Sequence, residues 1–88
     1  MALVATLIRP DGEVDSISLL EEEAGRLRQL QELVGGYIET VSLPGERCMV
    51  INENGKDGPH MVNHTATAIM PTDYIAGVAV ILPAEVLQ

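Results

Sequence analysis

The sequence contains no tryptophan and no phenylalanine, and it has only two tyrosines among 88 residues. A hydrophobic core must therefore be built from Leu, Ile, Val, Ala and Met. Tyr37 and Tyr74 are too few to form an interleaved stacking platform for nucleic acid bases. The length suits one domain, residues 1–88, whose small core gives modest stability unless subunits associate. We therefore expect a homo-oligomer.

Basic residues are also scarce. Five Lys and Arg stand against 13 Asp and Glu, and the formal net charge is −8. Such a charge repels a polyphosphate backbone, so we expect no nucleic acid partner. The single cysteine, Cys48, cannot form an internal disulfide, which fits a reducing compartment. The N-terminal apolar run is too short for a membrane span and lacks the basic flank of a secretory signal. These features predict a cytoplasmic protein without membrane contact.

Turn residues separate several short apolar segments. Pro10-Asp11-Gly12 is typical of a turn, and so is Pro44-Gly45, in which proline fixes φ and glycine accepts a positive φ. The predicted strands are residues 2–8, 13–19, 37–43, 47–52 and 74–82. The fourth strand is apolar on both faces, which predicts an inner position in the sheet. Gly77 predicts a bulge or a point of close backbone approach in the last strand.

One longer segment has helical periodicity. Ser18 and Glu21 have the spacing of a capping box, which predicts a helix that begins near Leu19. Its buried stripe is expected at Leu20, Ala24, Leu27, Gln31 and Val34 with Leu30 beside them, and its exposed face at Glu21, Glu22, Arg26, Arg28 and Glu32. Gly35 is expected to end this helix, and residues 61–70 are expected to form a short helix or an irregular loop. The fold class is therefore α+β: a mixed or antiparallel sheet of about five strands in ββαββ(α)β order, with one main amphipathic helix on one face.

Three marks in the sequence occur together. They are Val34-Gly35-Gly36-Tyr37-Ile38-Glu39, the turn Asn52-Glu53-x-Gly55-Lys56, and Asn63 with Ala66 shortly after it. With the flanking strands they resemble the domain of unknown function 3846 family, small proteins of actinobacteria, their phages and other mobile elements. The resemblance spans nearly the whole chain. It implies a fold and a mobile-element setting, and it implies no activity.

Six residues are the candidate ligand-binding set. Glu39 shares one side of its strand with Tyr37 and apolar neighbours, where a carboxylate must be paired, exposed at an edge, or placed at a pocket rim. Its other interpretation is an exposed edge position or a cap for the Gly35-Gly36 amides. Polar groups at a strand end and turn often bind ligands, although an Asn-Gly turn also explains several of them. The predicted ligand-binding residues are Tyr37, Glu39, Asn52, Glu53, Lys56 and Asn63.

Metal and catalytic chemistry are less well supported by the sequence. His60 and His64 are four residues apart, and Asp57 or Asp73 could supply a third ligand, but the ligand set of a tight zinc site is incomplete. No nucleophile elbow or phosphate-binding glycine loop is present. Asn63-His64-Thr65 matches a glycosylation sequon by chance in a chain without a secretory signal. We therefore expect no catalytic residues, no metal site and no cofactor.

Three functions remain open. The first is a non-catalytic protein of a phage or mobile element that sequesters a host nucleotide-derived immune signal in an oligomeric assembly, by analogy with small counter-defence proteins. An anionic ligand would require its cations to gather locally, from Arg9, Arg26, Arg28, Arg47 and Lys56. The alternative is an inhibitor or adaptor that binds a host protein through its acidic helix or a sheet edge. A hydrolase that cleaves such a signal is the third and least favoured hypothesis.

Overall fold

The fold is an antiparallel sheet that carries one main helix, as the sequence predicts. The computed structural model describes residues 3–58, 60–69 and 73–87. Along the chain these form β1 (Leu3–Ile8), β2 (Val14–Leu19), α1 (Glu23–Val34), β3 (Ile38–Leu43), β4 (Arg47–Asn52), the 3₁₀ turn η1 (Gly55–Asp57), α2 (His64–Ile69), β5 (Ala79–Pro83) and the 3₁₀ turn η2 (Ala84–Leu87). The strand order is β2-β1-β5-β4-β3, and every pair is antiparallel.

The two predicted hairpin turns are confirmed. In the first, the Gly12 amide donates to the Arg9 carbonyl over 3.0 Å, and Gly12 has a φ of 95°. In the second, Leu43 pairs with Arg47, and Gly45 has a φ of 81°. Only glycine adopts such φ values without steric cost, which is why these turns were readable from the sequence. The turns join β1 to β2 and β3 to β4, and in the strand order β2 and β3 are the outer strands of these hairpins.

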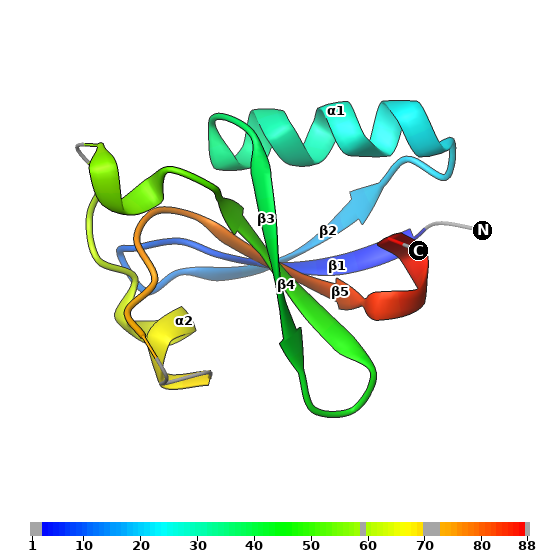
Figure 1. Ribbon diagram of the computed structural model, residues 1–88. Coiled ribbons are helices and arrows are strands. Elements are labelled where there is room, and N and C mark those ends of the chain that lie inside the picture. The colour runs from blue at the N-terminus through cyan, green and yellow to red at the C-terminus, as the bar shows by residue number, and fades with distance from the viewer. Residues whose placement is uncertain (1–2, 59, 70–72, 88) are drawn as a thin grey trace.

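The two faces of the sheet have separate cores. Under α1 the buried side chains are Ala5, Leu7, Leu19, Leu30, Val34, Cys48, Val50, Val80 and Leu82. The opposite face is covered at one end by α2 and the segment before β5, and its core comprises Ile8, Leu43, Met49, Ala66, Ile75, Ala79 and Ile81. Figure 1 shows α1 and α2 on opposite sides of the sheet. Alternate residues of β4 enter each core, which confirms its predicted inner position.

The start of α1 differs from the prediction. Ser18 lies in β2, so the capping box does not form. Glu22 is the N-cap instead, and its carboxylate accepts from the amides of Ala24 and Gly25, both over 2.8 Å. Gly25 fits here because a Cβ would lie 3.0 Å from that carboxylate. The helix therefore begins at Glu23, after β2 has continued to Leu19.

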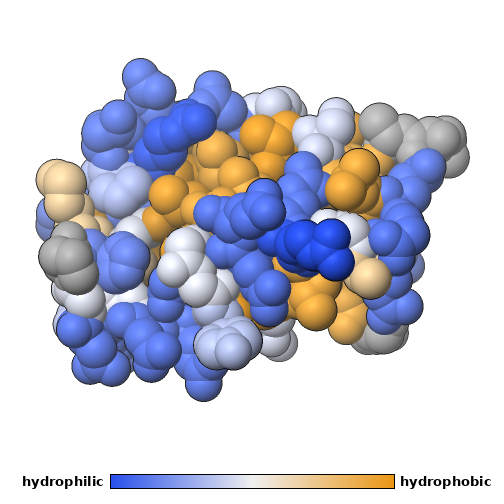
Figure 2. All heavy atoms as spheres, turned by 90° about the horizontal axis from the view of Figure 1, so that it is seen from above, coloured by the Kyte–Doolittle hydropathy of each residue, from blue (hydrophilic) through white to orange (hydrophobic). Residues whose placement is uncertain are grey.

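The buried side of α1 is also rotated relative to the predicted stripe. Leu30 and Val34 are buried, but Leu20 and Leu27 are exposed. Arg26, predicted to face solvent, donates instead to the carbonyls of Glu21 and Val86. This contact joins the start of α1 to η2, so the C-terminal residues up to Leu87 pack back onto the α1 side. Figure 2, which looks down on α1, shows hydrophobic residues in the middle of the molecule among hydrophilic ones.

The last strand begins later than predicted. Residues 74–78 precede β5 and form only the isolated bridge between Val62 and Ala76. Gly77 has a φ of 83°, and its amide donates to the Met61 carbonyl over 2.8 Å. Of the two alternatives predicted for residues 61–70, a short helix or an irregular loop, the helix occurs over part of the segment as α2, and Met70 lies outside the described residues. The chain before β5 is thus held by the α2 segment and does not extend the sheet.

None of the helices in the described part of the chain is long and apolar enough to cross a membrane.

Candidate functional site

A cleft of about 390 Å³ opens at the end of the sheet where η1 lies, on the left in Figure 1. Its walls come from the start of β3, the end of β4, η1 and the segment before β5. The lining residues are Glu39, Val41, Ile51, Asn52, Glu53, Gly55, Lys56, Asp57, Asp73, Tyr74, Ile75 and Ala76. The volume is within the range of small-molecule sites.

The strand register explains how the wall of the cleft forms. Glu39 pairs with Ile51, and Val41 pairs with Met49, so Glu39, Val41 and Ile51 share the sheet face opposite α1. Val41 and Ile51 are half-buried there, whereas Glu39 is exposed. Glu39 thus lies on the edge strand β3 and at the rim of the cleft, so its place fits both the predicted exposed edge and the predicted pocket rim. No hydrogen bond or ion pair of its carboxylate is found among the described residues.

A close backbone approach brings η1 against the opposite wall. Gly55 is buried, and a Cβ at this position would lie 2.9 Å from the Ala76 carbonyl oxygen. Such a distance is shorter than real Cβ contacts, so a side chain here would push η1 away from the segment before β5. The glycine of the Asn54-Gly55 turn therefore sets the width of the cleft. The Asn-Gly motif indicates a turn, but it does not indicate this close contact with Ala76.

Lys56 is held inside this arrangement. Its ammonium forms an ion pair with Asp73 and lies 4.6 Å from the centre of the Tyr74 ring. The hydrogen bond to Asp73 raises the pKa of Lys56, and the same bond lowers the pKa of Asp73. Both side chains remain largely exposed, so the pair is screened by solvent. The ion pair matters because it holds the Lys56 ammonium in the cleft.

Two predicted ligand-binding residues have structural roles. Asn52 borders the cleft, but its side-chain amide donates to the Val34 carbonyl over 3.0 Å, and its side-chain oxygen accepts from the Asn54 amide over 2.7 Å. It therefore caps the end of α1 and fixes the next turn. Asn63 lies outside the cleft and is fully buried. Both amides satisfy backbone groups in the core.

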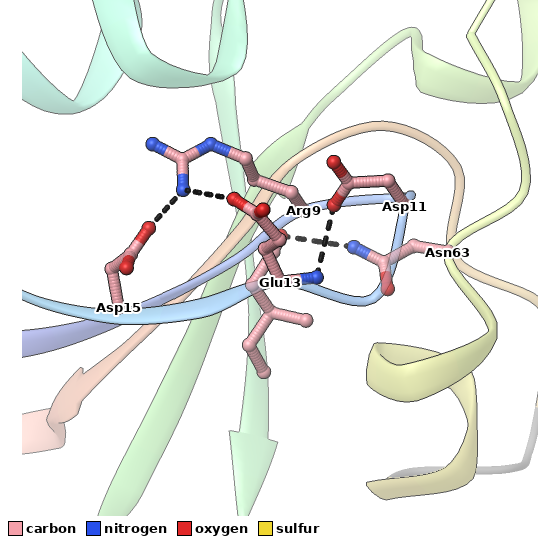
Figure 3. Close-up of polar contacts among 6 residues, drawn as sticks. Arg9, Asp11, Glu13, Asp15 and Asn63 are labelled. Atoms are coloured by element: carbon pink, nitrogen blue, oxygen red, sulfur yellow. Dashed lines mark hydrogen bonds and ion pairs between the residues drawn. The ribbon is translucent and has the colours of Figure 1, made fainter.

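Asn63 joins three parts of the chain. Its side-chain nitrogen donates to the carbonyls of Ile8 and Gly77, over 3.0 and 2.9 Å, and its side-chain oxygen accepts from the Ala66 amide over 3.0 Å. Figure 3 shows the amide directed at the end of β1. The last bond caps α2, which explains why Asn63 and Ala66 occur as a pair in the sequence. A buried amide with these partners is not accessible for glycosylation.

The remaining predicted residues divide between two places. Glu53 and Lys56 line the cleft with Glu39, whereas Tyr37 lies outside it and is 71% exposed. Tyr37 borders a shallower depression with Gly35, Gly36 and His60. Ligand-binding prediction missed Asp73, Tyr74 and Ile75, because these residues were assigned to a strand or considered only for a metal site. No sequence motif indicates that this segment approaches β3.

The other basic residues do not gather at the cleft. Arg9 pairs with Asp15 and Glu13 at the β1–β2 turn, as Figure 3 shows. Arg26 binds backbone carbonyls beside η2, and Arg47 donates to the Pro44 carbonyl in the β3–β4 turn. Lys56 is therefore the one cation among the described residues that line the cleft. In the same described ranges, no group of three or more His, Cys, Asp or Glu side chains is placed to hold a metal ion.

Comparison with known proteins identifies the family of the chain. No curated protein and no solved structure matches the sequence. The family model described as Domain of unknown function (DUF3846) matches residues 3–85. The match covers all five strands, α1, α2 and η1, which include the elements that form the cleft, and on this basis the chain belongs to the DUF3846 family.

Proposed function

We propose that the protein is a small, non-catalytic ligand-binding protein that holds a small molecule in the cleft between β3, η1 and the segment before β5. The observation that supports this most is the composition of the cleft wall. Apolar groups from Val41, Ile51 and Ile75 lie beside polar groups from Glu39, Glu53 and Lys56. Binding sites combine an apolar surface with a few polar groups in this way.

Sequestration is favoured over catalysis by the ionisable groups of the cleft. They are carboxylates, one tyrosine and a lysine that is already paired, and neither His60 nor His64 is among the lining residues. General acid–base chemistry at neutral pH usually employs a histidine or a carboxyl group whose pKa is raised. The pKa of Asp73 is lowered, whereas a carboxyl group that acts in such chemistry has a raised pKa. Binding without chemical conversion is therefore the function that we propose.

The narrower form of this proposal keeps the ligand predicted from the sequence, a host nucleotide-derived immune signal captured by an oligomer in the host cytoplasm. Four carboxylates line the cleft, from Glu39, Glu53, Asp57 and Asp73. A phosphate placed among them would be repelled. In this form the base and ribose would occupy the cleft, and the phosphates would point to solvent.

Native mass spectrometry tests the proposal. Protein purified from its host is measured intact and after denaturation, before and after incubation with host-cell extract. We expect a defined oligomer that releases a small-molecule mass on denaturation. Glu39→Lys should lose this mass, because it places a long cation at the cleft rim, whereas Glu32→Lys on the exposed face of α1 makes the same charge change and should retain it. A protein that carries no small molecule before or after incubation would contradict the proposal.

A second candidate function is binding of a host protein. Two observations favour it: β2 and β3 are each paired on one side only, and exposed carboxylates cluster at the start of α1. Edge strands accept an added strand, and an acidic surface suits a basic partner. Under this hypothesis Glu23→Lys and Glu32→Lys should abolish capture of the partner in an affinity purification, whereas Glu39→Lys should leave it intact.

A further inference from the structure

The cleft has an uneven distribution of charge. Four carboxylates, from Glu39, Glu53, Asp57 and Asp73, line it together with a single ammonium, from Lys56. They come from β3, the end of β4, η1 and the segment before β5, so they surround the cleft and do not lie on one surface helix or loop. Lys56 pairs with Asp73 and is also attracted by Glu39. Among the described residues, no ion pair is found for Glu53 or Asp57.

The wall of this cavity includes a cation that belongs to the chain itself, the ammonium of Lys56. The Lys56 ammonium lies 4.6 Å from the centre of the Tyr74 ring while it contacts the Asp73 carboxylate. An aromatic face beside a carboxylate is the environment that proteins use to recognise ammonium groups. The side chain of Lys56 is itself an ammonium group on an apolar chain. Its placement shows that this part of the cleft accommodates such a group. The Tyr74 ring adds to the carboxylates an aromatic surface that they do not supply.

The other walls suit the apolar part of such a molecule. Val41 and Ile51 contribute from the sheet, and Ile75 and Ala76 from the segment before β5. Alkyl groups gain free energy when they leave water for such a surface. No second basic residue lies among the described lining residues to hold a phosphate or a carboxylate. The cleft therefore combines an apolar surface with negative charge.

We infer that the ligand of the cleft is a small organic cation, with two or more ammonium groups on an apolar chain, and that Lys56 competes with one of these groups for Asp73 and Tyr74. This inference rests on the broad form of the proposed function, capture of a small molecule in this cleft, and it names a cation in place of the nucleotide-derived ligand of the narrower form. The remaining ammonium groups of the ligand bind Glu39, Glu53 or Asp57.

Calorimetric titration with spermidine tests the inference, with AMP as the anionic probe. The salt concentration should be about 0.15 M, where exposed charges more than about 8 Å apart are largely screened. Lys56→Met keeps an apolar chain and removes the competing ammonium, so spermidine should bind roughly three- to fivefold more tightly. Glu39→Gln should weaken spermidine binding by a similar factor. Glu32→Gln removes the same charge from α1 and should leave the affinity unchanged. Circular dichroism checks that each variant is folded.

The sign of the Lys56 effect decides the result. Spermidine that binds more tightly to Lys56→Met and more weakly to Glu39→Gln supports the inference. Equal weakening by Glu39→Gln and Glu32→Gln would mean diffuse attraction to an acidic protein, and it would overturn the inference. AMP binding that is lost in Lys56→Met, without spermidine binding, would overturn the inference while it supports small-molecule capture. If neither probe binds, the inference fails, and the proposed function is judged by native mass spectrometry alone.

Discussion

Replacement of Asn63 by alanine is expected to lower the free energy of unfolding by about 3 kcal/mol or more, in proportion to the buried groups that lose their partners. The substitution removes the partners of the Ile8 and Gly77 carbonyls and of the Ala66 amide. Asn63 is 0% exposed, so water does not readily replace these bonds. A buried polar group without a partner costs about 1–3 kcal/mol, and small domains have only about 5–15 kcal/mol in total.

Urea denaturation followed by circular dichroism measures this effect. His64→Ala is the matched control, because His64 is adjacent in sequence, is exposed, and lies at the first position of α2. We expect the control to change the stability by less than about 1 kcal/mol. If Asn63→Ala had the stability of the wild type but lost its ligand, Asn63 would be a binding residue, as the sequence predicted, and its bonds in the core would be unimportant.

The second large effect is expected at Leu30. Leu30→Ala should lower the free energy of unfolding by about 2–5 kcal/mol, because Leu30 is 0% exposed in the core between α1 and the sheet, and truncation leaves a cavity. Leu27 lies on the same helix but is 44% exposed, and Leu27→Ala should cost less than about 1 kcal/mol. Alanine favours the helix in both variants, so propensity does not separate them.

The pair Leu30→Ala and Leu27→Ala tests the rotation of α1 directly. Equal losses in thermal or urea denaturation would mean that Leu27 is buried in solution, as the sequence periodicity predicted. Such a result would contradict the described orientation of the helix. If the losses instead depended on protein concentration, the described orientation would stand, and the exposed Leu27 would lie in a contact between subunits.

Local chemistry explains why much of the fold was predictable. Gly12 and Gly45 are required by positive φ at their turns, and Gly35 ends α1 with a φ of 81°. These requirements depend only on neighbouring residues, so the sequence reveals them. The apolar faces of β4 similarly reveal its inner position. The short connections explain the antiparallel pairs β1–β2 and β3–β4, whereas the position of β5 between β1 and β4 was not predicted.

The helix was predicted less accurately because distant partners determine its register. Gln29 accepts from the Leu20 amide and donates to the Ser18 carbonyl, which ties α1 to the end of β2. Arg26 binds the Val86 carbonyl, 60 residues along the chain. Both contacts turn polar side chains toward the molecule and leave Leu27 exposed. Hydrophobic periodicity alone does not include such bonds.

The candidate site was predicted only in part, because its walls also depend on contacts between residues that are distant in the sequence. Glu39 was recognisable as a carboxylate on an apolar strand face, and Glu53 and Lys56 as polar groups after a strand. Asn63 was assigned to the site as another polar mark of the family resemblance, and its residue type does not show whether its amide binds a ligand or backbone groups. Tyr74 reaches the cleft only through the close approach of Gly55 to Ala76, which is a property of the folded chain.

Nuclear magnetic resonance mapping tests the proposed cleft most directly. Amide chemical shifts of the labelled protein are recorded before and after addition of host-cell extract, and again with the small-molecule fraction of that extract. We predict the largest changes at Glu39, Ile51, Lys56 and Tyr74, with both samples. Changes confined to β2 or to the start of α1, and produced only by the protein-containing extract, would contradict a small-molecule site and favour a protein partner.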